Sequence, residues 1–138
     1  MKPSSDEHRG LGGLIRRRLI NTTRYSWRGL MQGWKSEEAL RVELISAAVL
    51  LPVALLVPVT PAERALLILV LALVLMAELL NSAVEAAVDR IGEEFHPLSG
   101  KAKDLGSAAV FISLILTLVV WIIILYPLVS AFISGSSD

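Results

Sequence analysis

The chain has 138 residues, of which 54% are hydrophobic and only 19% are charged, and its formal net charge is zero. Nearly all of the charges lie in the first 43 residues or between Glu78 and Asp104. The remaining runs of Leu, Val, Ile and Ala are too long to be buried in the core of so small a protein, so they predict membrane-spanning helices. The absence of cysteine excludes a disulfide framework, a thiolate nucleophile and a cysteine-based metal site.

Two different segments precede the first apolar run. Residues 1–13 are polar and contain several glycines, which predicts a disordered tail. In residues 14–41, four side chains follow the spacing of one helical face: Trp27, Leu30, Met31 and Trp34. Basic residues occupy much of the remainder, which is typical of a helix that lies in the headgroup layer of a membrane. A soluble amphipathic helix is the alternative, but the sequence offers no soluble core for it to cover.

Three transmembrane helices are expected after this surface helix, at about residues 43–59, 65–89 and 106–130. The first contains two prolines, which membrane helices tolerate. A tight turn at 60–64 leads to the second span, and a polar loop at 89–104 leads to the third. The expected fold is therefore all-α, with one membrane domain over residues 14–133 and a short C-terminal tail at 134–138.

The distribution of Lys and Arg predicts the orientation in the membrane. Nine of the thirteen precede the first span, one lies in the 60–64 turn, three lie in the 89–104 loop, and none follows the third span. Cytoplasmic loops carry an excess of positive charge. We therefore expect the N-terminus and the 89–104 loop in the cytoplasm, where nucleoside triphosphates are.

One face of the second span is polar. Five residues fall within about 60° of one meridian at 100° per residue: Glu78, Asn81, Ser82, Glu85 and Asp89. A carboxylate in hydrocarbon costs about 2.5–3.5 kcal/mol, so this face should point at other helices or at a water-filled site. Counted from Ala65, Glu78 lies about 20 Å into a core about 30 Å thick, and Glu85 lies about 10 Å closer to the cytoplasm.

Carboxylates at these depths suit phosphoryl transfer. Glu78 can act as a general base toward a hydroxyl, and Glu85 with Glu37 or Glu38 can hold Mg²⁺ through oxygen ligands. Three cations are available to balance the phosphoryl charge: Lys103, Arg90 and Arg18. Intramembrane polar residues can instead join helices by hydrogen bonds, and Ser82 fits that role better. Without a nucleotide-binding glycine motif, the residues alone indicate only a polar, cytoplasm-facing site between helices.

Four stretches of the chain also match one family. They are ELLNSAVEAAVD at 78–89, YSWRGL at 25–30, Glu37 with Arg41, and HPLSGKAKDLGSAA at 96–109. In order and spacing these stretches resemble prokaryotic diacylglycerol kinase, over about residues 14–130. The N-terminal extension and the Ser-rich end lie outside the resemblance.

The resemblance implies an enzyme that phosphorylates 1,2-diacylglycerol to phosphatidic acid, with ATP as cosubstrate and Mg²⁺ as cofactor. It implies a homotrimer in the bacterial inner membrane, with sites shared between neighbours and no nucleic-acid partner. It makes Glu78 the general base, with Asn81 supporting the site and Glu37 and Glu85 binding the metal. The nucleotide contacts would be Arg18, Tyr25, Glu37, Glu85, Glu94, Phe95, His96, Lys103 and Asp104. The lipid contacts would be Arg18, Arg41, Glu78, Ser107 and Trp121.

Three other functions fit parts of this pattern. An undecaprenol (polyprenol) kinase would share the fold, and only the sequence LSGKAKDLGSAAV favours diacylglycerol over it. A small proton- or cation-coupled transporter would also bury Glu and Asn on one face, but it would have little use for a Trp-bearing surface helix and a long charged loop. A structural membrane subunit would have no need of Glu78 in hydrocarbon.

Overall fold

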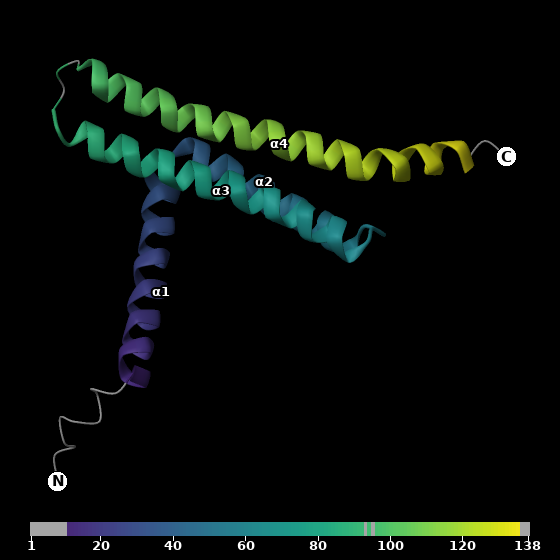
Figure 1. Cartoon of the computed structure of the whole chain (residues 1–138), viewed down its shortest axis with the longest axis horizontal. Helices are drawn as coiled ribbons and strands as arrows, with labels where there is room; N and C mark the ends of the chain where they lie inside the picture. Colours follow the sequence, from purple (N-terminus) through teal and green to yellow (C-terminus); the bar gives the residue numbers. More distant parts are fainter. Residues whose placement is uncertain (1–10, 93, 95, 136–138) are drawn as a thin grey trace, which may run out of the picture. The chain divides into compact units, whose positions relative to one another are not determined.

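A computed structural model describes residues 11–92, 94 and 96–135. It contains four α-helices: α1 (Leu11–Ser36), α2 (Glu38–Leu56), α3 (Pro61–Asp89) and α4 (Pro97–Gly135) (Figure 1). Helices α2, α3 and α4 are long and apolar enough to cross a membrane, and no strand occurs within the described ranges. The prediction of an all-α protein with three spans is confirmed. The predicted N-terminal tail falls mostly on residues 1–10, outside the described residues, and so do residues 136–138.

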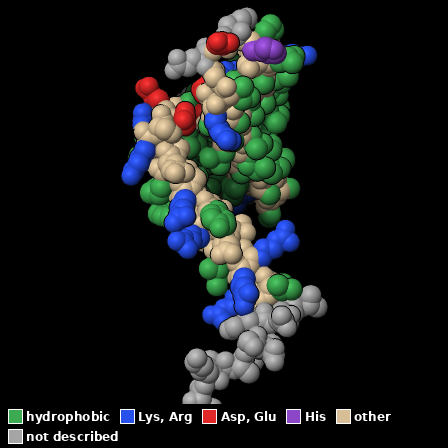
Figure 2. Space-filling view, turned by 90° about the vertical axis from the view of Figure 1, so that its left-hand side faces the viewer, with side chains coloured by type: hydrophobic (Ala, Val, Ile, Leu, Met, Phe, Trp, Pro, Cys, Tyr) green, Lys and Arg blue, Asp and Glu red, His purple; other side chains and the backbone are tan. Residues whose placement is uncertain are grey.

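The chain divides into two compact units between Ser36 and Glu37. In the first unit, α1 begins at Leu11, three residues before the predicted start, and carries six basic residues and no acidic one. These basic side chains follow the helix along its length (blue in Figure 2). Trp27 and Trp34 are exposed on the same helix. That α1 lies in the headgroup layer stays a prediction.

The second unit begins with an extended residue. Glu37 has φ −104° and ψ 117°, so it cannot continue α1, and α2 starts at Glu38. The Glu37 carbonyl accepts the Arg41 N–H at 3.4 Å, which begins the hydrogen-bond pattern of α2. The prediction of one helix over 14–41, followed by a span from residue 43, was wrong in its bounds. The surface helix ends at Ser36, and the first span begins at Glu38, five residues before the predicted residue 43.

The turn between α2 and α3 is fixed by side chains. The Thr60 hydroxyl accepts the Glu63 N–H at 3.3 Å, and the Glu63 carboxylate accepts the Thr60 N–H at 2.8 Å. This capping box, with Pro61 at the first helical position, starts α3 four residues before the predicted residue 65. The Arg64 guanidinium donates to the carbonyls of Leu55 and Val57, which satisfies carbonyl groups at the end of α2.

Helix α3 packs against both α2 and α4 (Figure 1). Ala54, Leu67 and Ile124, one residue from each helix, form a buried core toward the α2–α3 turn. Further along, the Thr117 hydroxyl donates to the Val70 carbonyl at 3.2 Å and joins α4 to α3. The apolar core thus holds one half of the three-helix unit together, and the polar residues of α3 occupy the other half.

The third span is one continuous helix from Pro97. The connection before it covers only residues 90–96, so the predicted loop at 89–104 was too long at its end. Pro97 suits the first position of a helix, and the His96 Nδ1 accepts the Leu98 N–H at 3.2 Å. At 1.5 Å per residue α4 measures about 58 Å, which is longer than a hydrocarbon core of about 30 Å is thick.

Candidate active site

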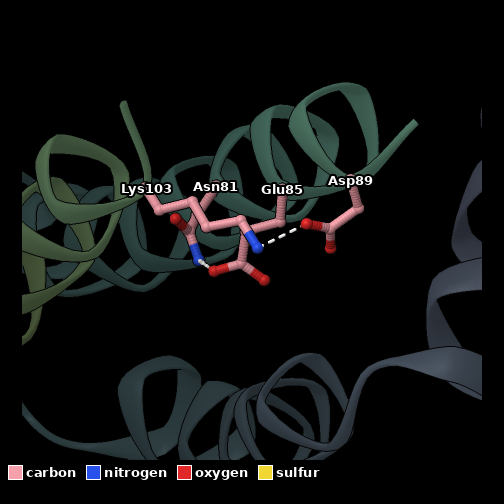
Figure 3. A network of polar contacts seen from close by, with 4 residues as sticks. All are labelled: Asn81, Glu85, Asp89 and Lys103. Carbon is pink, nitrogen blue, oxygen red and sulfur yellow. Dashed lines mark hydrogen bonds and ion pairs between the residues drawn. The ribbon is translucent and has the colours of Figure 1, made fainter. Parts of the chain in front are cut away.

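The polar face of α3 forms two direct contacts (Figure 3). The Asn81 Nδ2 donates to the Glu85 Oε1 at 3.0 Å, one turn along the same helix. The Lys103 Nζ, on α4, lies 2.5 Å from the Asp89 Oδ1. A cation from the first turns of α4 therefore reaches back to the end of α3, which brings the predicted nucleotide-binding Lys103 to the carboxylate face.

The deepest polar residues of this face are buried. Glu78 is 4% exposed and Asn81 is 9% exposed, although both lie on a helix that is otherwise largely apolar. Glu78 lies close enough to Glu85 and Glu37 for their negative charges to repel. Three predicted site carboxylates, two on α3 and one at the start of α2, therefore converge. An anionic cluster of this kind favours a cation or a proton near it.

A fourth carboxylate, Glu43 on α2, was missed by the sequence analysis. It is half-buried, its Oε2 is buried without a hydrogen-bond partner among the described residues, and it too interacts electrostatically with Glu78. Glu43 lines a mainly apolar groove of about 340 Å³ to which α2, α3 and α4 all contribute, with Leu50, Leu75 and Leu114 on its walls. The cost of placing a carboxylate in a span applies to Glu43 as it does to Glu78, and this signal could have identified it.

The α3–α4 connection bounds a hollow of about 790 Å³, a size within the usual range of ligand pockets. Glu94 and His96 line it, and both also line an adjoining hollow that contains Asp89 and Lys103. Three of the predicted nucleotide contacts are thus brought together. Asp104 is exposed on α4 next to Lys103, and Phe95 lies outside the described residues.

The remaining predicted residues are more scattered. Arg18 and Tyr25 are exposed on α1, in the other unit, and their assignment to the nucleotide stays a prediction. Arg41 is half-buried on α2, and Ser107 is exposed on α4. Trp121 packs against the cluster of Ala54, Leu67 and Ile124. Leu67 precedes Glu78 by eleven residues, or about 16 Å along α3. Trp121 can therefore meet only the part of a lipid that extends far from Glu78.

Known proteins resemble the chain over most of its length. The family model for prokaryotic diacylglycerol kinase matches residues 24–125. The diacylglycerol kinase of Pseudomonas aeruginosa is 47% identical over 125 residues, which cover 91% of this chain and 98% of that protein. That of Escherichia coli (strain K12) is 46% identical over 109 residues, covering 79% and 89%. That of Haemophilus influenzae is 50% identical over 103 residues, covering 75% and 87%.

The chain belongs to the prokaryotic diacylglycerol kinase family. The matched residues of this family include all four converging carboxylates, the Asn81–Glu85 contact and the Lys103–Asp89 ion pair. They begin after Arg18, which stands outside the family match. The part of the chain that the family shares is therefore the part that forms the polar site.

A divalent cation suits this kinase site, although no group of three or more acidic or His side chains that could hold a metal occurs within the described ranges. Mg²⁺ usually takes only one or two protein carboxylates, together with waters and substrate phosphates. Glu85 and Glu37 provide two carboxylates, and both lie near Glu78. Asn81 donates one hydrogen bond to the Glu85 Oε1, so the Glu85 Oε2 keeps both of its lone pairs for a cation. The donor set fits a metal that arrives with a nucleotide.

Proposed function

We propose that this chain is a diacylglycerol kinase, which transfers the γ-phosphoryl group of ATP to the free hydroxyl of 1,2-diacylglycerol and releases phosphatidic acid and ADP. The relatives named diacylglycerol kinase match this chain over nearly their whole length. This match favours diacylglycerol over a polyprenol as the lipid substrate. The observation that carries the proposal is the depth order of the polar groups. A buried Glu78 is followed along α3 by Glu85 and then by the Asp89–Lys103 pair beside the loop hollow.

This order matches a reaction between a lipid and a soluble cosubstrate. Glu78 lies about 10 Å along the helix from Glu85 and about 16 Å from Asp89. The hydroxyl of a lipid headgroup can reach Glu78 from the apolar side, and the phosphates of ATP can reach Glu85 and Lys103 from the cytoplasmic side. The hollow lined by Glu94 and His96 is then the place for the rest of the nucleotide.

In the proposed reaction, the Glu78 carboxylate accepts the proton of the lipid hydroxyl. The hydroxyl oxygen forms a bond to the γ-phosphorus while the bond from that phosphorus to the β–γ bridging oxygen breaks, and ADP leaves. Lys103 provides positive charge beside the phosphates. Mg²⁺, when bound with the nucleotide through Glu37 and Glu85, would neutralise developing charge on the transferring group. The buried position of Glu78 keeps water away from the reacting hydroxyl.

The activity is tested with purified protein in mixed micelles, supplied with Mg²⁺ and γ-labelled ATP. We expect labelled phosphatidic acid from 1,2-diacylglycerol and at least about tenfold less product from undecaprenol at equal mole fraction, a difference of about 1.4 kcal/mol in the barrier. Preferential labelling of undecaprenol would identify the sister kinase activity. Absence of any labelled lipid would contradict the kinase proposal and favour a transporter.

The proposed mechanism also requires a defined topology in the bacterial inner membrane, with the N-terminus and the α3–α4 connection in the cytoplasm. Because the chain has no cysteine, Ser99→Cys and Ser134→Cys can report the two sides. A membrane-impermeant thiol reagent applied to intact cells should label position 134 and spare position 99, and permeabilised cells should label both. Labelling of position 99 alone in intact cells would place Glu85 and Lys103 away from ATP and contradict the proposal.

We also propose a homotrimer, which the family resemblance implies. Its support within this structure is the large apolar surface that the spans leave uncovered, for example at Phe111, Ile123 and Phe132, which lipid or neighbouring copies must cover. The mass of the detergent-solubilised protein would decide the number of copies.

A further inference from the structure

We propose that Gly106 on α4 is a positioning residue for the metal-binding carboxylate Glu85, and that it acts through Asn81. This inference rests on the proposed function, because it assumes that Glu85 serves the metal–nucleotide complex. Its physical basis is a close approach between α3 and α4, which exists only because residue 106 has no side chain.

The contact is specific to Asn81. A Cβ atom built on Gly106 would overlap the Asn81 Oδ1 and would lie 3.3 Å from the Asn81 Cγ and 3.6 Å from its Cα. All three nearest atoms thus belong to one residue. The Asn81 Oδ1 is buried, and it has no hydrogen-bond partner among the described residues. Its carbonyl end is therefore held by packing against the α4 backbone rather than by a donor.

The other end of the same amide holds Glu85. With the Oδ1 pressed toward Gly106, the Asn81 Nδ2 points along α3 and donates to the Glu85 Oε1 at 3.0 Å. The amide thus lies between the two residues, and its orientation is set by the space at Gly106. This hydrogen bond fixes one carboxylate oxygen of Glu85 and leaves the other for the proposed cation.

Glycine is otherwise a poor choice at this place. Gly106 lies well inside α4, and glycine is among the least favourable residues in a helix interior. An alanine would favour the helix, so the glycine needs a packing reason. The Asn81 side chain provides that reason. A side chain at position 106 would push the amide away from α4 and release its hydrogen bond to Glu85.

The experiment compares Gly106→Ala, Asn81→Ala and the double variant, each as full-length protein in detergent. The first readout is the Mg²⁺ concentration for half-maximal turnover, the second is Mn²⁺–ATP binding by calorimetry, and the third is Tm without ligands. Gly12→Ala is the matched control, because nothing lies within 4 Å of a Cβ at Gly12 and because that residue lies outside the family match.

We expect Gly106→Ala to raise the Mg²⁺ requirement and to weaken Mn²⁺–ATP binding by about tenfold or more, a typical effect of losing the partner of a metal ligand. The KM for diacylglycerol should stay as in wild type. In the Asn81→Ala background, Gly106→Ala should cause no further loss, because the amide is already gone. Gly106→Ala should lower Tm in wild type, where the new methyl group overlaps Asn81. It should raise Tm in the Asn81→Ala background, where alanine only favours the helix.

The proposal would be overturned if Gly106→Ala kept the Mg²⁺ requirement and the Mn²⁺–ATP affinity of wild type. It would also be overturned if Gly106→Ala weakened Mn²⁺–ATP binding equally in wild type and in Asn81→Ala. If Gly106→Ala does not fold, the double variant decides. Folding of the double variant would support Asn81 as the obstacle, and its failure to fold would overturn the proposal. If wild type does not phosphorylate diacylglycerol, the proposed function fails by itself, while Tm and Mn²⁺–ATP binding still test the link from Gly106 to Glu85.

Discussion

Replacing Glu78 by Gln should reduce phosphorylation of diacylglycerol by about 10²–10⁴-fold, the usual effect of removing a general base. Gln keeps the size of the side chain and its capacity for hydrogen bonds, but it cannot accept the proton of the lipid hydroxyl. Removing one of several mutually repelling carboxylates should also stabilise the fold or leave it unchanged. The measurements are initial rates in mixed micelles, Mn²⁺–ATP binding and Tm, and only the rate should fall.

Glu63→Gln is the matched control for this substitution. It makes the same chemical change on the same helix, about 22 Å from Glu78, and Gln can replace Glu in the capping box with Thr60. We expect its rate to equal that of wild type. If Glu78→Gln retains more than a few per cent of activity, another group takes the proton. Glu43 would be the first residue to examine, because it lies near Glu78 and lines the adjoining groove.

Much of the site could be predicted because helical geometry is regular. Once Glu78 to Asp89 lies on one helix, the 3.6-residue period alone places the polar residues on one face. The structure keeps that arrangement, with Asn81 bonded to Glu85 and Asp89 reached by Lys103. The buried state of Glu78 follows similarly from the cost of exposing a carboxylate to lipid.

The errors concern helix ends and contacts between helices. The start of α3 was readable, because Thr60-Pro-Ala-Glu63 is a capping box with proline at the first helical position. The sequence analysis placed Glu43 at the first residue of the span expected at 43–59 and did not consider it as a site residue. The break at Glu37 starts α2 at Glu38, which moves Glu43 to the second turn of that helix, where it interacts electrostatically with Glu78.

The role inferred for Gly106 could not be predicted by any local rule. Nothing in the sequence around residue 106 says that Asn81 lies opposite, since the two residues are 25 positions apart and belong to different helices. Helix propensity alone would mark Gly106 as a weak point of α4. Only the packing of α3 against α4 shows what the missing side chain allows.

Replacing Glu85 by Gln should raise the Mg²⁺ concentration for half-maximal activity by more than about tenfold, because an anionic oxygen ligand is lost. Glu37→Gln should do the same, since the other proposed ligand enters from the start of α2. Saturating Mg²⁺ should restore part of the rate in each variant, whereas it should not rescue Glu78→Gln. The measurement is a Mg²⁺ titration at fixed total ATP, accompanied by Mn²⁺–ATP binding.

The comparison between Glu85 and Glu37 separates a metal site from a purely structural cluster. If the four carboxylates only repel one another, neutralising Glu85 or Glu37 should stabilise the protein. The Mg²⁺ curve should then stay as in wild type, as it should for the control Glu63→Gln. If Glu85 and Glu37 share a cation, each single variant should shift the Mg²⁺ curve. The double variant should shift it by less than the product of the two single shifts, because the second substitution removes a ligand from a site that has already lost its metal. Mg²⁺ curves like that of wild type in both single variants would place the metal elsewhere and leave Lys103 as the principal positive charge beside the phosphates.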